Sequence, residues 1–208
     1  MSTCLAAVAL AGLLGGSGVS DDGWEHFETF SVLVSMNAAA DGATLYTRPD
    51  GEGLPLTHAY AHDGSPVDAT ITATFVDPDW EPIVGIARED LWLASSSGGL
   101  AACADGTLAD GPTDELGNAY WRLPLRAGGH TVGESLRVVA AGMMLQRELD
   151  LTVKSPDLDG DLVVLLPDIA AFIPAIGTAT NECDFNNDGV VDLADIARFV
   201  AAIGVGCR

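Results

Sequence analysis

Acidic side chains recur at alternate positions near the end of the chain, and this spacing is typical of calcium-binding loops. Calcium is held by about six to eight oxygen atoms, which a twelve-residue loop supplies from positions 1, 3, 5, 7, 9 and 12. Residues 184–195 offer a ligand at each position: Asp184, Asn186, Asp188, the Val190 carbonyl, Asp192 and Asp195. Position 9 often acts through a water molecule, so Asp192 is the least direct ligand. Gly189 stands at position 6, where glycine adopts the required left-handed backbone without steric cost.

A second copy of the pattern lies upstream, at residues 157–168, and it is less complete. Its ligand positions carry Asp157, Asp159, Asp161, the Val163 carbonyl and Asp168. Leu162 replaces the glycine at position 6, and Leu165 replaces the polar residue at position 9. A leucine with a positive φ costs about 1 kcal/mol or more, so we expect two calcium sites, of which the second is stronger. The alternative is a pair of solvated Asp-rich turns without metal.

The two loops belong to an internal repeat of loop and helix. Residues 157–177 align with residues 184–204 at a shift of 27, and 12 of the 21 aligned positions are identical. Apolar residues with the spacing of one helical face follow each loop: Ile169, Phe172, Ile173 and Ile176, then Ile196, Phe199, Val200 and Ile203. We expect these stripes to be core, with the two helices packed as a pseudo-twofold pair. Pro174 should end or kink the first helix early.

Residues 155–208 resemble a type I dockerin. The resemblance rests on Asp, in place of Glu, at position 12, on the lack of an entering helix and on the short spacing between copies. It implies a calcium-ordered helix pair that docks on a cohesin domain and assembles secreted proteins, often for polysaccharide breakdown. Many dockerins carry Ser-Thr at loop positions 10 and 11, but here these are Leu166-Pro167 and Leu193-Ala194. The segment is therefore closer to the diverged dockerin-like repeats of secreted bacterial proteins, and a cell-wall or sorting partner is equally open.

The middle of the chain has the pattern of short strands and frequent turns. Residues 67–76 alternate, with Ile71, Ala73 and Phe75 on one face and threonines on the other. Further strand candidates are 27–34, 91–93, 119–125, 135–140 and 149–153, and the turn candidates include 78–82 and Gly128-Gly129. The sequence thus predicts a mainly β fold, with an antiparallel β-sandwich at residues 67–154 and a strand region or linker at 21–66. Residues 68–153 resemble bacterial Ig-like domains of the invasin and intimin type, through DATITAT at 68–74 and TDELGNA at 113–119; this implies a spacer or adhesive module.

Composition and the N-terminal segment indicate an exported protein. The net charge of −21 argues against nucleic-acid binding, which needs basic patches. Residues 1–20 have the short apolar run and small residues of a signal peptide, and no other segment is long enough to span a membrane. We expect a secreted or cell-surface bacterial protein. A Cys183–Cys207 disulfide would staple the second loop unit and leave Cys103 free, but the sequence does not decide this pairing.

Few residues point to catalysis. His58 and His62 lie four apart in HAYAH, but a zinc motif of this kind needs a Glu that is missing here, and the composition favours a loop. Cys103 with His130 lacks local support as a nucleophile pair, and no two carboxylates stand out as a glycosidase pair. We therefore expect a non-catalytic protein whose calcium module docks on a cohesin-like or cell-surface partner. The alternative is a carbohydrate-binding or polysaccharide-degrading component, for which the candidate aromatic residues are Trp24, Trp80, Trp92 and Trp121.

Overall fold

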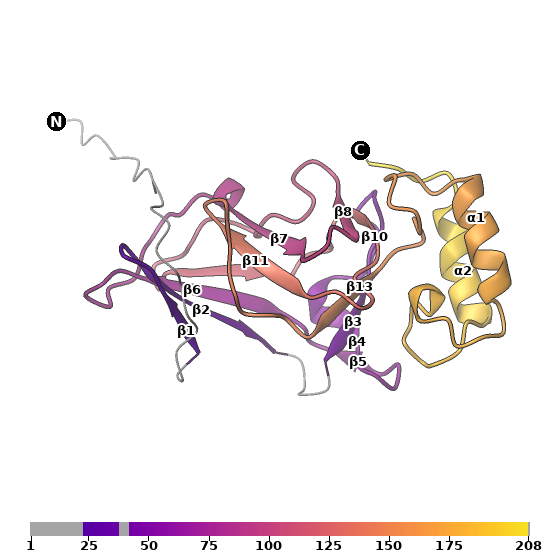
Figure 1. The fold of residues 1–208 in the computed structure, drawn as a ribbon, viewed down its shortest axis with the longest axis horizontal. Coiled ribbons are helices and arrows are strands. Elements are labelled where there is room, and N and C mark those ends of the chain that lie inside the picture. Colours follow the sequence, from indigo (N-terminus) through magenta and orange to yellow (C-terminus); the bar gives the residue numbers. More distant parts are fainter. Residues whose placement is uncertain (1–22, 38–41, 208) are drawn as a thin grey trace.

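The computed structural model describes residues 23–37 and 42–207, and it is mainly β (Figure 1). The strands are β1 (Trp24–His26), β2 (Ser31–Met36), β3 (Ala43–Tyr46), β4 (Ala59–Tyr60), β5 (Pro66–Val67), β6 (Ile71–Val76), β7 (Leu91–Ser95), β8 (Leu100–Ala102), β9 (Asn118–Trp121), β10 (Ala127–Gly129), β11 (Leu136–Ala140), β12 (Met143–Met144) and β13 (Leu151–Lys154). The helices are α1 (Leu166–Phe172) and α2 (Leu193–Ala202), with 3-10 turns η1 (Leu56–His58), η2 (Arg88–Asp90), η3 (Ile173–Ala175) and η4 (Asn181–Cys183). The expected signal peptide, residues 1–20, lies outside the described residues.

Within the described residues the strands form four sheets. Their orders are β1-β2-β6-β9, β12-β11-β7, β13-β3-β4-β5 and β10-β8. The pairings are antiparallel except that of β13 with β3, which is parallel. A parallel pair cannot be joined by a tight turn, and here more than 100 residues of the chain lie between β3 and β13. This pairing therefore brings β3 beside the strand that precedes the first acidic loop.

Strand β6 has alternating buried and half-buried residues, which explains its position in the β domain. Ile71, Ala73 and Phe75 are buried, while Thr72 and Thr74 between them are half-buried, so the predicted alternation is confirmed. The strand lies between β2 and β9, and its buried face meets the other sheets. An amphipathic strand of this kind places one face in a core and leaves the other to polar residues.

One hydrophobic core joins the sheets of the β domain. Val34 of β2, Leu45 of β3 and Leu93 of β7 belong to the same buried cluster, although they lie in three different sheets. Trp121 of β9 is 1% exposed, and its indole N–H donates to the carbonyl of Thr107 at 3.0 Å. The tryptophan is therefore a satisfied core residue, which removes it from the candidate ligand-binding aromatics.

The described part of the region 21–66, residues 23–37 and 42–66, is the strand region of the two alternatives and belongs to the β domain. Strand β2 pairs with β6 over its whole length, from Ser31 opposite Val76 to Met36 opposite Ile71. Strand β3 pairs with β13, which lies more than 100 residues later. The expectation missed these pairings because strand partners are set by long-range contacts and not by local pattern.

Gly128 and Gly129 were predicted to form a turn, but they lie in β10, which pairs with β8. Their lack of side chains serves close packing. A Cβ on Gly128 would lie 1.7 Å from a carboxylate oxygen of Asp157, and one on Gly129 would lie 2.1 Å from the carbonyl oxygen of Gly99. Glycine within a strand often marks such a close approach of another chain segment.

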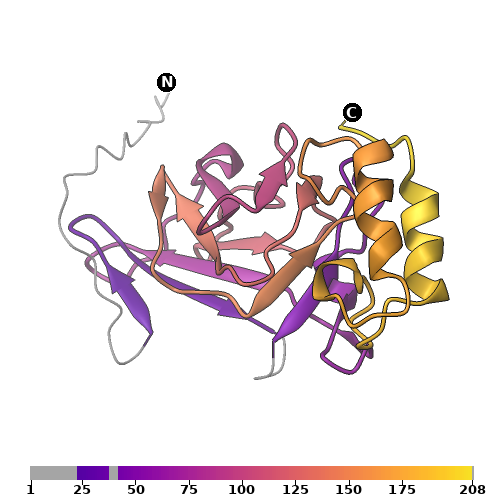
Figure 2. The same cartoon turned by 45° about the vertical axis from the view of Figure 1, so that its right-hand side comes forward.

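The C-terminal residues form a small loop–helix unit with its own core. Helices α1 and α2 lie side by side at one end of the molecule (Figures 1 and 2). The Phe172 and Phe199 rings stack with centroids 4.3 Å apart, and Phe172 also stacks on Phe185 at 5.8 Å. Two helices are therefore present where they were expected, but they are short, with 7 and 10 residues, and they do not confirm the expected all-α domain. Helix α1 gives way to the 3-10 turn that contains Pro174, as predicted.

Only half of each apolar stripe is core, which corrects the expectation that both stripes would be buried. Phe172 and Phe199 are buried, and Ile169 and Ile196 pack against the same cluster. The other stripe residues are exposed: Ile173 60%, Ile176 43%, Val200 59% and Ile203 45%. The unit buries its aromatic side against Tyr46 of β3, whose ring lies 5.6 Å from that of Phe185. The opposite side has no packing partner among the described residues.

Among the described residues, no helix has both the length and the apolar character needed to cross a bilayer.

Candidate metal centres

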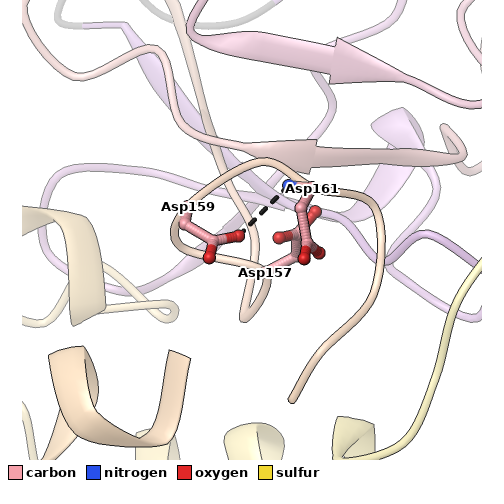
Figure 3. Close-up of side chains that lie close together, drawn as sticks. All are labelled: Asp157, Asp159 and Asp161. Carbon is pink, nitrogen blue, oxygen red and sulfur yellow. Dashed lines mark hydrogen bonds between the residues drawn. The ribbon is translucent and has the colours of Figure 1, made fainter. Parts of the chain in front are cut away.

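The first acidic loop gathers three carboxylates between β13 and α1. Oxygen atoms of Asp157, Asp159 and Asp161 all lie within 4.8 Å of one another, and the side chains turn toward a common point (Figure 3). Backbone amides hold them there: the N–H of Asp161 donates to Oδ1 of Asp159 at 3.1 Å, and that of Leu162 donates to Oδ2 of Asp157 at 2.8 Å. The loop thus has the oxygen-only chemistry that hard divalent cations prefer.

Asp168, the predicted position-12 ligand, closes this loop by hydrogen bonds. Its carboxylate is buried and accepts from the N–H of Leu158 at 2.7 Å and from that of Leu165 at 2.8 Å. It lies in the first turn of α1, where a carboxylate is stabilised by the free N–H groups of the helix. Asp168 therefore joins the two ends of the loop and fixes where the helix begins.

The second loop gathers Asp184, Asp188 and Asp195, whose oxygens also lie within 4.8 Å of one another. Asp195 joins the two ends of this loop, as Asp168 does in the first loop. It accepts from the N–H of Phe185 at 2.7 Å and from that of Asp192 at 3.0 Å. The carboxylate of Asp192 is instead used as the N-cap of α2, where it accepts from the N–H of Ala194 at 2.7 Å. Asp192 is thus the predicted acidic ligand that the structure leaves outside this cluster.

The two loops have the same backbone shape. At position 4, Gly160 has φ +73° and Asn187 has φ +57°; at position 6, Leu162 has φ +73° and Gly189 has φ +93°. Leu162 therefore adopts the left-handed conformation that its position was expected to impose. A positive φ strains the backbone of a leucine but not that of a glycine. The same loop shape therefore costs more free energy in the first loop than in the second.

Asn186, at position 3 of the second loop, has an unsatisfied acceptor. Its Nδ2 donates to Oδ2 of Asp188 at 2.7 Å, but its Oδ1 is buried and has no hydrogen-bond partner among the described residues. A buried acceptor without a partner costs about 1–3 kcal/mol. A cation between Asn186 and the neighbouring carboxylates would satisfy it, so the residues present fit a metal ion.

Burial and the neighbouring charges raise the pKa of one buried carboxyl in each loop. Burial raises the pKa of Asp157 to about 6, and the charges of Asp168, Asp161 and Asp159 add to the shift against an opposing backbone hydrogen bond from Leu162. Burial also raises the pKa of Asp195, with a further contribution from Asp184. Each loop therefore concentrates negative charge in a desolvated place, which a divalent cation would relieve.

Lys154 and Asn187 belong to the second centre, and the sequence analysis missed them. The Lys154 ammonium donates to the carbonyl of Asp184 at 2.7 Å and to Oδ1 of Asn187 at 3.2 Å. Burial lowers the pKa of Lys154, while the charges of Asp184 and Asp195 act in the opposite direction. The available signal was that Lys154 is the single lysine of the chain and stands just before the first loop.

The other candidate centres are not assembled in the described part of the chain. Among these residues the acidic groups of the two loops are the clusters that could hold a metal ion, and neither includes His58 or His62. Cys103 forms a disulfide with Cys207, so it offers no free thiol to His130. This corrects the suggested Cys183–Cys207 bridge: Cys183 is buried in the core of the loop–helix unit as a free thiol.

Six exposed apolar residues lie in the two helices or within a few residues after them. They occupy equivalent places in the repeat: Leu166 and Leu193, Ile173 and Val200, and Ile176 and Ile203. Leu166 and Leu193 are 78% and 80% exposed. Clustered exposed apolar side chains mark interaction surfaces more often than isolated ones do. We call these six residues the helix face.

Comparisons of the chain with protein-family models, with curated proteins and with solved structures found no match. The geometry of the two loops and the surfaces beside them are therefore the features that indicate a function.

Proposed function

We propose that residues 155–207 form a calcium-stabilised docking module of the dockerin type, carried by an exported, non-catalytic protein. The observation that carries the proposal is that two successive loops each gather three carboxylates within 4.8 Å, and that a helix follows each loop. The helix face then gives the module an apolar surface for a protein partner. The β domain, as an Ig-like sandwich, would act as spacer or adhesive module.

Calcium is the cation that suits these loops best. The candidate donors are all oxygens: Asp157, Asp159, Asp161, the Val163 carbonyl and Asp168 in the first loop, and Asp184, Asn186, Asp188, the Val190 carbonyl and Asp195 in the second. Asp192, which lies outside the carboxylate cluster, would act through a water molecule. Calcium accepts about six to eight such ligands in flexible geometry, whereas magnesium demands a near-ideal octahedron and keeps several waters. Bound calcium would supply the positive charge that the loops lack, and binding free energy would become folding free energy.

The helix face indicates the chemistry of the partner. Loop position 10, where many dockerins carry a hydroxyl that contacts the cohesin, here carries Leu166 and Leu193, and both are largely exposed. A partner that fits this face would present apolar side chains and not hydroxyl acceptors. We therefore favour a diverged cohesin-like or cell-surface protein.

Export agrees with the chemistry of the chain. Disulfides persist in oxidising compartments outside the cytosol, and the Cys103–Cys207 bridge joins the β domain to the loop–helix unit. The net charge of −21 suits a soluble acidic surface. Both observations support a secreted or cell-surface location.

A calcium titration of the full chain after chelator treatment tests the proposal. We expect heat from two binding events by calorimetry, with a weaker response to magnesium. Asp161→Ala and Asp188→Ala, at exposed position 5 of each loop, should each remove one event, while Asp79→Ala at an exposed turn should remove neither. Absence of heat in the unmodified chain, or heat that survives both loop substitutions, would contradict calcium binding.

A second candidate function, carbohydrate binding, is favoured by one aromatic pair. The Trp24 and Trp80 rings meet edge to face at 5.1 Å, and Trp80 is 56% exposed. Trp80 has φ +66°, an unusual conformation for a bulky residue. The pair lies by β1, at the end of the molecule away from α1 and α2 (Figures 1 and 2). Exposed indole rings are suited to stacking on sugar rings.

A binding assay on insoluble polysaccharides separates the two functions. Retention of the full chain that is lost in Trp80→Ala would favour carbohydrate binding. Trp92→Ala is the control, because Trp92 is half-buried in β7, which belongs to a different sheet from β1. No retention on any polysaccharide would leave docking as the function.

A further inference from the structure

A cavity of about 310 Å³ lies in the β domain, and none of its lining residues belongs to the two acidic loops. Its walls come from the start of η2, from residues 105–110 between β8 and β9, and from residues 123–126 between β9 and β10. Arg88 and Arg126 line it together with apolar residues that include Leu108, Leu123 and Leu125. A cavity of this size, with apolar walls and few charged groups, is typical of a site for a small ligand.

Backbone hydrogen bonds fix two of these segments relative to each other. The N–H of Arg126 donates to the carbonyl of Gly106 at 2.9 Å, and the N–H of Cys103 donates to the carbonyl of Arg126 at 3.0 Å. The Arg126 guanidinium also donates to the carbonyl of Ala104. A Cβ on Gly106 would collide with the Arg126 carbonyl oxygen, so this close approach requires a glycine. The walls of the cavity are therefore held in place by the chain itself.

The charged residues of the cavity differ in how they are paired. The Asp110 carboxylate is occupied, because it accepts from the backbone N–H of Arg122 at 3.0 Å and from its Nε at 3.3 Å. The buried Nε of Arg88, in contrast, has no hydrogen-bond partner among the described residues, and Arg88 takes part in none of the ion pairs among them. A buried donor without an acceptor is costly. An anionic ligand would supply the acceptor that Arg88 lacks.

Positive charge is concentrated here in a chain that is otherwise acidic. Arg88, Arg122 and Arg126 are three of only nine basic residues, against 30 acidic ones. Two carboxylates, those of Asp105 and Asp110, also line the cavity, so the three guanidinium groups leave an excess of one positive charge. The net charge of −21 repels anions at longer range. A ligand with a single negative charge is therefore favoured over a polyanion.

We propose that this cavity binds a ligand that carries one carboxylate on a compact apolar body. A guanidinium pairs with a carboxylate through two parallel hydrogen bonds, and Arg88 has a donor free for this contact. Leu123, which is 60% exposed, offers an apolar surface to the rest of the ligand. A free organic acid and the C-terminal residue of a peptide share this chemistry. The site lies in the β domain and does not depend on the proposed calcium sites.

Proton–nitrogen NMR spectra of the isotope-labelled full chain test the proposal with three probes. Isocaproate and N-acetyl-leucine present a carboxylate beside the same branched apolar group, and N-acetyl-leucinamide is the neutral control. We expect both acids to shift the Arg88 Nε–H resonance, which is assigned by its loss in Arg88→Gln, and the amide to leave it in place. Tighter binding of N-acetyl-leucine would identify a peptide C-terminus as the ligand, and equal binding would identify a free acid. No shift with either acid, or an equal shift with the amide, would overturn the proposal.

Substitutions with opposite expected effects measure the role of the charges, with the backbone resonances of residues 105–110 as the readout. Arg88→Gln should weaken the binding of N-acetyl-leucine by about tenfold or more, because it removes a charge-assisted hydrogen bond. Arg137→Gln is the matched control, since Arg137 is also half-buried but pairs with Glu148 and does not line the cavity. Asp105→Asn should strengthen binding by about twofold or more, because it removes a like charge from the site.

Unchanged affinity in Arg88→Gln would contradict the proposal, and so would weaker binding in Asp105→Asn. The second substitution decides the question even if Arg88→Gln does not fold, because Asp105 is exposed and its loss leaves the walls of the cavity intact.

Discussion

Single residues account for the difference between two loops that share one backbone shape. Leu162 and Gly189 both have positive φ, and Asp157 and Asp184 both begin a loop, yet their surroundings differ. The first loop carries a strained leucine and a buried carboxylate without a cation. The second has a glycine, and Lys154 donates to the backbone carbonyl of its first aspartate. Metal-free stability should therefore be limited mainly by the first loop.

Exchange of the position-6 residues should have opposite effects in the two loops. Leu162→Gly should stabilise the chain by about 0.5–1 kcal/mol, because the relief of strain exceeds the added freedom of the unfolded chain. Gly189→Leu should destabilise it by about 1–2 kcal/mol through the backbone alone, since a Cβ there would have open space around it. Urea unfolding with saturating calcium measures the effects of both substitutions on stability. Effects of the same sign would contradict the same backbone shape in the two loops.

The pH dependence of metal-free stability should report on Asp157. Its pKa is raised to about 6 in the folded chain from 3.8, so folding favours the protonated form. The contribution of Asp157 to stability is therefore full below about pH 4, and about 2–3 kcal/mol of it is lost as the pH rises to 7. Bound calcium would hold the carboxylate ionised and remove this trend. Urea unfolding between pH 4 and 7, with and without chelator, checks this, and Asp157→Asn should flatten the metal-free curve.

At the scale of elements, α1 and α2 each have a side that is buried and a side that is exposed. Phe172 and Phe199 stack inside the unit, whereas the helix face is turned outward. The Arg198 guanidinium, on the inner side, donates to the Tyr60 hydroxyl at 2.6 Å and so ties α2 to β4. The helices therefore join the β domain by one side and leave the apolar residues of the other side exposed.

Alanine substitutions should separate these two sides. Phe172→Ala should cost about 3–5 kcal/mol, because it opens a cavity in a small aromatic core. Ile173→Ala, the next residue along the chain, should change stability by less than about 0.5 kcal/mol, because its side chain is 60% exposed. Chemical unfolding in calcium measures both, and a large loss for Ile173→Ala would mean that the helix face is covered within the chain.

At the scale of the whole molecule, several bonds besides the chain connection join the loop–helix unit to the β domain. The disulfide joins Cys103 to Cys207 across 104 residues, and Lys154, Asn187 and Gly129 make further bonds between the two parts. The partner of the helix face would therefore be held in a fixed orientation relative to the β domain.

Removal of the Cys103–Cys207 disulfide should strongly destabilise the folded chain. Cys207→Ser should cost about 4–5 kcal/mol in the chain-entropy account of a loop of this length. Peptide mapping without reduction should recover a Cys103–Cys207 pair. Cys183 should react with a thiol reagent only after unfolding, because it is buried and burial raises its pKa to about 11. A mapped Cys183–Cys207 pair would refute the observed connectivity.

The sequence by itself determined the features that depend on nearby residues. Ligand spacing within twelve residues located both acidic loops, and the alternation in β6 and the position of Pro174 were read correctly for the same reason. Tertiary structure alone decided which half of each helix stripe is buried, that Gly128 lies in a strand, that Cys103 is the partner of Cys207 and that Lys154 lies under the second loop. These features depend on contacts between residues that are distant in the chain, and local sequence patterns do not determine which of these residues pack together.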